Sequence, residues 1–115
     1  MIPPNDRSRT EIPPGTLEML ILKTLKRFGS MHGYRIAKTI QQTSEEILRV
    51  EEGSLYPALQ RLLMKGWATA EWVQAGPKRR ARVYHLTPAG RKQLAVELSE
   101  YRRVSQAIAR VIQPA

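Results

Sequence analysis

Basic side chains crowd one short stretch of the chain, the five positions from Lys78 to Arg82. Four of these five residues, Lys78, Arg79, Arg80 and Arg82, are cationic, and no Asp or Glu occurs between residues 72 and 96. A basic loop of this kind contacts phosphate groups and supplies affinity with little sequence information. The cluster therefore predicts an electrostatic contact with a polyanion. A solubilising hairpin turn is the alternative.

The segment before this cluster is predicted to form a short helix that begins at an N-cap, Ser54, and ends at Gly66. Its buried stripe is Leu55, Ala58, Leu59 and Leu62. A helix with a polar outer face fits the DNA major groove, and no acidic residue lies between Gly53 and Ala70. The candidate DNA contacts on this helix are Ser54, Tyr56, Gln60, Arg61 and Lys65. An ordinary surface helix with a solvated basic face is the alternative.

Two alternating segments around the basic cluster, Trp67 to Gln74 and Ala81 to Leu86, predict the strands of a hairpin. The basic cluster is then the hairpin tip, and Lys78, Arg79 and Arg80 are its candidate phosphate contacts. A groove-binding helix beside a cationic hairpin is the combination of elements that characterises a winged helix-turn-helix. The predicted fold class is therefore α+β, mainly α.

A long terminal helix is expected from Pro88 to about Ile112, with Thr87 as its N-cap. At 1.5 Å per residue it is roughly 37 Å long, too long for so small a domain to cover. Its apolar stripe has heptad spacing with one polar interruption, and consists of Leu94, Leu98, Tyr101, Ser105, Ile108 and Ile112. We expect this stripe to form a homodimer interface, with simple packing against the first helix as the alternative.

The remaining segments complete three predicted regions. Residues 1–15 contain four prolines and are expected to be an arm with little structure of its own. Residues 16–87 form the winged-helix domain, with helices over about 16–28 and 32–42 and a short strand within 47–50. Residues 88–115 form the C-terminal dimerisation helix.

Composition narrows the function. The chain has 115 residues, 19 Lys and Arg against 10 Asp and Glu, and a net charge of +9, which predicts attraction to nucleic acid or to an anionic membrane. There is no cysteine, the two histidines are far apart, and no catalytic motif is evident, so we expect no metal, no cofactor and no enzymatic activity. No apolar run is long enough to span a membrane and no signal peptide precedes the domain, so a cytoplasmic location is expected. The aromatic residues Tyr34, Trp67 and Trp72 are expected in the core rather than around a ligand.

Three segments, HGYRIAK, EEGSLYPALQRLLMKGW and VYHLTPAGRKQL, together resemble the PadR family of bacterial transcriptional regulators over residues 16 to about 100. The resemblance implies a winged helix, a homodimer formed through the C-terminal helix, and repression from a palindromic operator in double-stranded DNA. It implies that Tyr56 contacts DNA, that Ser54 lies near phosphates, and that residues 78–80 belong to the wing. The single terminal helix resembles the short type of the family, and a small-molecule effector, which the residues do not identify, is a further expectation.

Other readings of the residues stay open at this point. A winged-helix module that binds protein and a non-specific nucleic-acid binder both fit the same helix and hairpin. A binder of anionic membranes would need an amphipathic helix with a basic face, whereas the terminal helix is only mildly basic.

Overall fold

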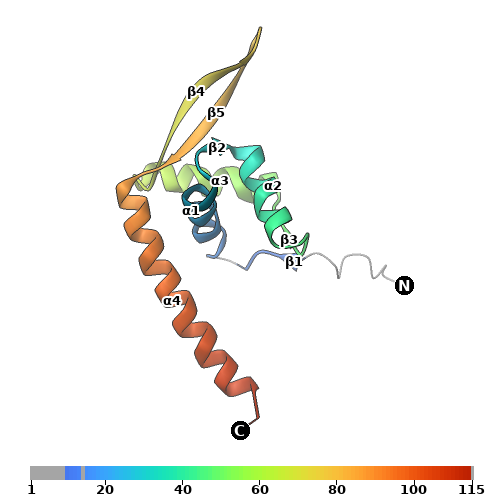
Figure 1. Ribbon diagram of the computed structural model, residues 1–115, viewed down its shortest axis with the longest axis vertical. Helices are drawn as coiled ribbons and strands as arrows, with labels where there is room; N and C mark the ends of the chain where they lie inside the picture. The colour runs from blue at the N-terminus through green and yellow to red at the C-terminus, as the bar shows by residue number, and fades with distance from the viewer. Residues whose placement is uncertain (1–9, 14, 115) are drawn as a thin grey trace, which may run out of the picture.

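The computed structural model describes residues 10–13 and 15–114 of the chain (Figure 1). Its elements, in chain order, are β1 (Thr10–Glu11), α1 (Leu17–Phe28), β2 (Met31–His32), α2 (Gly33–Thr43), β3 (Leu48–Arg49), α3 (Glu52–Met64), β4 (Ala68–Gly76), β5 (Arg79–Leu86) and α4 (Pro88–Ile112). Three helices followed by a β-hairpin and a long last helix make the winged helix-turn-helix that the sequence predicts.

The core lies where α1, α2 and α3 pack together under the base of the hairpin. Ile21 and Leu22 of α1, Ile36 of α2, and Leu59 and Leu62 of α3 are completely or almost completely buried. The predicted stripe of α3 is confirmed, because all four of its apolar residues are in this core. Burial of these large aliphatic side chains is the main favourable term that holds the three helices together.

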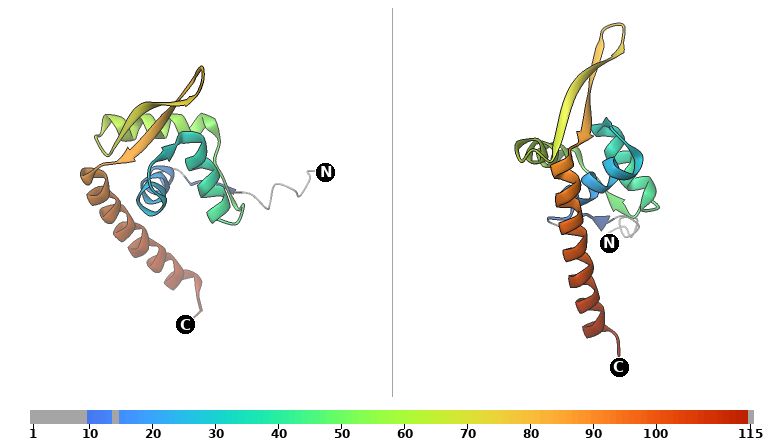
Figure 2. Two further views of the ribbon diagram at one scale, coloured as in Figure 1. Left: turned by 45° about the horizontal axis from the view of Figure 1, so that its top comes forward. Right: turned by 60° about the vertical axis from the view of Figure 1, so that its left-hand side comes forward.

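The hairpin β4–β5 is the wing, and it projects well beyond the helices (Figures 1 and 2). Its strands pair antiparallel from Ala68↔Leu86 at the base to Gly76↔Arg79 at the tip, and β2 adds a third strand beside β5. Both strands reach closer to the tip than the sequence predicted. The turn is shorter as a result, and Arg79 and Arg80 are strand residues rather than loop residues.

Helix α3 begins three residues earlier than predicted, so Ser54 is not its N-cap. Glu51 occupies the N-cap position, and its carbonyl oxygen accepts hydrogen bonds from the backbone N–H of Ser54 at 3.0 Å and of Leu55 at 2.8 Å. The first turn therefore contains Glu52, whose carboxylate favours the positive end of the helix dipole. Ser54 therefore lies inside the first turn of α3 rather than at its cap.

The segment before α1 departs in part from the expected unstructured arm. Thr10 and Glu11 form β1, which pairs parallel with Leu48 and Arg49 of β3. The prediction of a short strand after α2 is confirmed by β3, and its partner is the N-terminal segment rather than the wing. Residues 1–9 and 14 of the predicted arm lie outside the described residues.

Helix α4 begins as the sequence predicts and runs away from the domain (Figures 1 and 2). Its N-cap is Thr87, whose Oγ1 accepts a hydrogen bond from the backbone N–H of Gly90 at 2.9 Å and donates one to the Gly66 carbonyl at 2.8 Å. The first turns pack against α1 through Leu94, which is fully buried, and Leu98, which is half-buried. Within the described ranges, no helix is long and apolar enough to cross a lipid bilayer.

Candidate nucleic-acid interface

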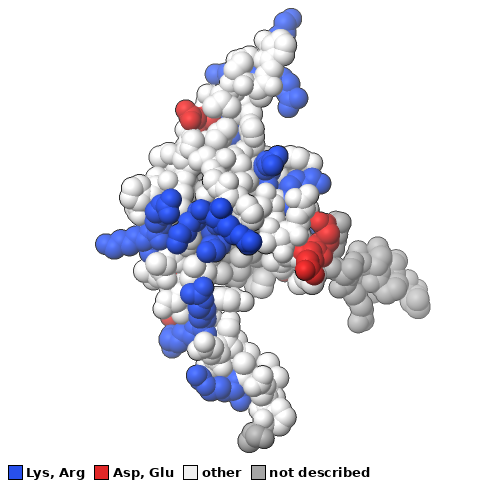
Figure 3. All heavy atoms as spheres, in the orientation of Figure 1, with Lys and Arg blue, Asp and Glu red and all other residues white. Residues whose placement is uncertain are grey.

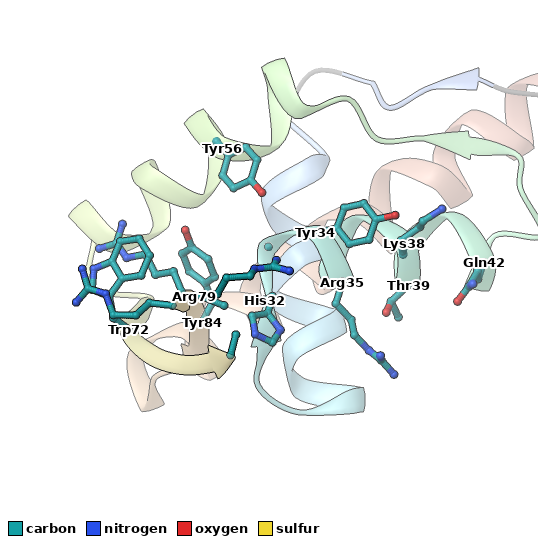
Figure 4. A pocket seen from close by; sticks show the side chains of 15 residues that line it. His32, Tyr34, Arg35, Lys38, Thr39, Gln42, Tyr56, Trp72, Arg79 and Tyr84 are labelled. Carbon is teal, nitrogen blue, oxygen red and sulfur yellow. The ribbon is translucent and has the colours of Figure 1, made fainter. Parts of the chain in front are cut away.

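A cleft of about 970 Å³ separates the inner face of the wing from α2 and the start of α3. We call it the wing cleft. Its α2 wall is formed by His32, Tyr34, Arg35, Lys38, Thr39 and Gln42. Its wing wall is formed by Trp72, Arg79, Arg80, Arg82 and Tyr84. Tyr56 reaches it from α3, so that α2, α3 and the wing meet around one hollow (Figure 4).

The wing cleft is cationic on both walls. Arg35 and Lys38 face it from α2, and Arg79, Arg80 and Arg82 from the wing, whereas no Asp or Glu is among the described residues that line it. Figure 3 shows that Lys and Arg also mark the wing tip and the face that carries α1, while acidic side chains gather at the right-hand edge of this view near β3, with another beside the wing. A concave surface with one sign of charge attracts a polyanion and concentrates it locally.

Tyr56 is the predicted DNA contact that the structure places in the wing cleft from α3. Its side chain is 44% exposed, and its ring passes over Gly33, where a Cβ atom would come within 3.1 Å of the ring carbon Cε1. Burial raises the pKa of the Tyr56 hydroxyl above its ordinary value of 10.0, and Glu52 and Tyr84 add to the shift. The hydroxyl is therefore a neutral hydrogen-bond donor at neutral pH, suited to a phosphate oxygen.

The other predicted contacts on α3 do not share this cleft. Ser54 and Arg61 line a second hollow beside the N-terminal segment, and Arg61 Nη2 pairs with Glu18 Oε1 at 2.7 Å. Lys65 places its Nζ 4.8 Å from the centre of the Trp67 ring. Gln60 is exposed on the surface of α3. These side chains stay predicted contacts, but Arg61 and Lys65 already have partners within the chain.

Of the predicted wing residues, Arg79 and Arg80 line the wing cleft, and Lys78 lies in the turn at the tip. Arg35, Lys38 and Arg82 line it as well. Arg82 was predicted only as a member of the basic cluster, and the two α2 residues were not predicted site residues. The signal for Arg82 was present in the sequence, because strand alternation gives it the same face as Tyr84. The two α2 residues could not be assigned to the cleft before the wing had been placed against α2.

The prediction that Tyr34 and Trp72 are core aromatics is wrong. Tyr34 is 64% exposed and Trp72 is 57% exposed, and both line the wing cleft. The wing extends past the helices (Figure 1), so none of the described elements covers the outer half of its sheet. Trp67, at the base of the wing, is half-buried and packs against the core as expected.

The opposite face of the wing is tied to the helices by His85. Its Nδ1 lies 2.6 Å from Ser30 Oγ, and its Nε2 lies 2.8 Å from Glu71 Oε1. These contacts join β5, β4 and the turn after α1, so His85 has a structural role. Within the described part of the chain, no group of three or more His, Asp or Glu side chains is placed to hold a metal ion.

The outer half of α4 presents an uncovered apolar stripe. Tyr101 and Ile108 are each 53% exposed, and Ile112 is more exposed still. Leu94, which was predicted to belong to this stripe as a dimer contact, lies instead in the core of its own chain, because the first turns of α4 pack on α1. The exposed stripe therefore starts further along the helix, at Tyr101.

Comparisons with known proteins agree with this geometry. Residues 21–96 match the family model described as the transcriptional regulator PadR-like family. A comparison with curated proteins finds no significant match. Among solved structures, a transcriptional regulator from Clostridium thermocellum superimposes with a TM-score of 0.80 at 26% identity, covering 86% of this chain and 95% of the other.

Two further structures extend the comparison. A protein from Streptococcus mutans is 31% identical, with a TM-score of 0.66 over 84% of this chain and 85% of the other. Bacillus subtilis PadR, solved in complex with operator DNA, is 28% identical, with a TM-score of 0.66 over 72% of this chain and 47% of the other. The similarity to the DNA-bound protein covers less than half of that chain.

Proposed function

The chain belongs to the PadR-like family of transcriptional regulators, and we propose that it is a repressor that binds a palindromic operator in double-stranded DNA as a homodimer. In this proposal α3 enters the major groove, and Tyr56 and the wing hold the flanking phosphates. Ser54, Gln60, Arg61, Lys65, Lys78, Arg79 and Arg80 are the remaining proposed contacts. The chain acts by binding rather than by catalysing a reaction.

The observation that carries the proposal is the charge of the wing cleft. Five Lys and Arg side chains line it, two from α2 and three from the half of β5 nearest the tip, and no carboxylate is among the described lining residues. Cations that face one another across a hollow repel unless an anion lies between them. A DNA strand supplies such an anion at every nucleotide, and α3 lies beside the cleft in the position from which a helix can enter the adjacent groove.

The homodimer rests on the outer half of α4. This half carries exposed Tyr101, Val104, Ile108 and Ile112 on neighbouring turns, and it extends beyond the domain of its own chain (Figure 1). A long apolar stripe on a helix is stable in water only when a partner covers it. A second copy of α4 is a self-complementary partner, and two-fold symmetry would place two α3 helices about one DNA turn apart, ~34 Å.

The test is selection of DNA by the full chain from a library of random duplexes, followed by binding measurements in increasing salt. We expect an enriched sequence with two inverted half-sites. We also expect a linear fall of log affinity against log salt, with a slope near −0.9 for each phosphate contacted. A plain duplex of scrambled sequence is the control, and it should bind more weakly with a similar slope.

Two other outcomes would assign the chain to a different functional class. Equal affinity for selected and scrambled duplexes would make it a non-specific nucleic-acid binder. Absence of DNA binding at low salt would favour the protein-interaction module. Repression itself is tested with a reporter gene placed behind the selected sequence, whose expression should fall when the protein is present.

A further inference from the structure

The inner face of the wing carries a column of aromatic and guanidinium groups. The register places Trp72 directly opposite Arg82, with Gln74 opposite Arg80 one step nearer the tip and Ala70 opposite Tyr84 one step nearer the base. Side chains of directly opposed residues lie on the same face of a hairpin. The column therefore runs from the tip to the core along the wall of the wing cleft.

The members of this column are stacked on one another. The guanidinium carbon Cζ of Arg80 lies 5.2 Å from the centre of the Trp72 ring, and that of Arg82 lies 5.7 Å from the same ring. Arg82 also lies 5.9 Å from the Tyr84 ring. Cations within about 6 Å of an aromatic face are attracted by its quadrupole, so these contacts hold the side chains in place before any ligand arrives.

The contacts within the column leave part of its apolar surface exposed and one of its hydrogen-bond donors unpaired. Trp72 keeps more than half of its surface exposed, and Nε of Arg82 is buried without a hydrogen-bond partner. A tryptophan on a projecting hairpin contributes little to the core, and an unpaired guanidinium N–H is costly to bury. Both features are those of a surface built to receive a ligand that is part apolar and part anionic.

The α2 wall of the cleft also pairs an aromatic ring with a cation. Tyr34 is exposed, and Nζ of Lys38 lies 5.7 Å from the centre of its ring. Figure 4 shows Tyr34, Lys38 and Arg35 on α2 across the hollow from Trp72 and Arg79. Aromatic faces beside cations therefore occur on both walls of one open cleft.

From this arrangement we propose that one sugar–phosphate strand of duplex DNA runs through the wing cleft, with Trp72 packed on deoxyribose and Arg82 bound to a phosphate. The inference rests on the proposed function and adds to it two contacts on the inner face of the wing, away from its tip. Alternating apolar sugars and anionic phosphates match the alternating rings and cations of the column. Trp72 then supplies affinity that is independent of salt, whereas Arg82 supplies affinity that depends on it.

The first experiment follows the fluorescence of Trp72 directly. The chain has two tryptophans, so a Trp67→Phe background leaves Trp72 as the sole tryptophan reporter. The probe is the duplex that the wild-type chain selects from a random library. We expect its addition to change the intensity and wavelength of Trp72 emission as the ring leaves water, and to protect the ring from quenching by iodide. A deoxynucleoside monophosphate serves as the comparison and should leave the emission unchanged.

The second experiment separates the two roles by salt. Trp72→Val keeps a residue that favours strands and should weaken binding to the selected duplex on the order of fivefold to tenfold, with the salt slope unchanged. Arg82→Gln should weaken binding and reduce the slope by about 0.9, the value for one phosphate. Val73→Thr, the neighbouring position on the other face of β4, is the matched control and should bind as the wild type does.

The outcomes distinguish this inference from the proposed function. If no duplex is selected, the proposed function falls and the inference falls with it. If the wild type and Trp72→Val bind the selected duplex equally and Trp72 emission does not change, the inner face does not contact DNA and only this inference is overturned. Equal losses in Trp72→Val and Val73→Thr would reveal a role in wing folding, and a full response to the mononucleotide would assign the cleft to a small ligand. Either of these results also overturns the inference.

Discussion

Gly90 marks the tightest approach between two elements of the fold. It lies in the first turn of α4, and a Cβ atom built on it would come within 2.0 Å of the Trp67 carbonyl oxygen and 2.8 Å of Leu86 Cδ1. The carbonyl belongs to the backbone and itself accepts a hydrogen bond from the N–H of Thr87 at 3.2 Å, so it cannot move away freely. Only glycine lets α4 start this close to the base of the wing.

Replacing Gly90 with alanine should therefore destabilise the whole domain. We expect Gly90→Ala to lower the free energy of unfolding by about 3 kcal/mol, at the upper end of the range for overpacking a rigid site. Gly53→Ala is the control, since Gly53 lies in α3 with no atom within 4 Å of the added Cβ, and its effect should stay within about 1 kcal/mol. Urea denaturation followed by circular dichroism measures both. Equal stabilities for the two variants would contradict the close approach.

The hydroxyl of Tyr56 is separable from its ring. Tyr56→Phe keeps the ring against α2 and removes the proposed phosphate donor, so affinity for the selected duplex should fall about fivefold while stability at neutral pH stays the same. Because folding raises the pKa of this tyrosine above 10.0, its contribution to stability is fully present below that value and declines as the pH rises through the raised pKa. The variant should lose this alkaline dependence. A stability loss at neutral pH with unchanged affinity would make Tyr56 a core residue instead.

For single residues, the sequence predicted the structure correctly where a local rule on backbone conformation applied. Thr87 and Pro88 predicted the start of α4 correctly, because a side-chain cap and a proline at the first helical position are local features. Ser54 also has a side-chain hydroxyl that can cap a helix, but α3 starts before it, with Glu51 as N-cap and Glu52 in the first turn. Trp72 was predicted to be buried because large aromatics usually are, and only the projection of the wing exposes it.

The wing is the element whose register decides the candidate site. Alternation along the two segments predicted both strands, yet not how far they continue toward the tip, since Gly76 and Arg79 carry weak strand preferences that the pairing overrides. The extra pairs bring Arg79 and Arg80 out of the turn and onto the wall of the wing cleft. The basic cluster is thus divided between the tip, at Lys78, and the inner face.

Reversal of charge in the wing tests this element as a whole. We expect the double variant Arg79→Glu and Arg80→Glu to weaken binding to selected and scrambled duplexes by similar factors and to flatten the salt slope by about two contacts, roughly 1.8. Phosphate contacts carry no sequence information directly, so specificity should change little. Filter binding or fluorescence anisotropy over a salt series gives both quantities. Wild-type affinity of the double variant at low salt would exclude the wing as a DNA element.

In the whole molecule, the proposed DNA-binding surface and the proposed dimer surface lie far apart. The wing lies at one end, and the outer half of α4 lies at the other (Figure 2). Heptad spacing predicted the apolar stripe of α4, but the sequence could not tell where the core of the chain ends and the stripe begins. Leu94 and Leu98 pack within the chain, whereas the residues from Tyr101 onward do not. Tests of assembly should therefore be made in the outer half, where a substitution leaves the domain intact.

Ile108→Glu is the substitution that meets this condition. Ile108 is 53% exposed in the single chain and is not a member of its core, so the monomer should fold with wild-type helicity. A charge buried in the proposed dimer seam costs several kcal/mol, enough to shift a micromolar dimer to monomer.

Gln106→Glu adds the same charge on another side of the helix, about 140° from the centre of the stripe at 100° per residue, and should remain dimeric. Light scattering gives the mass of each, and the selected duplex should bind Ile108→Glu far more weakly because two half-sites are no longer linked. A wild-type chain that is monomeric at micromolar concentration would contradict the dimer, as would an Ile108→Glu variant that keeps both its dimeric mass and its affinity.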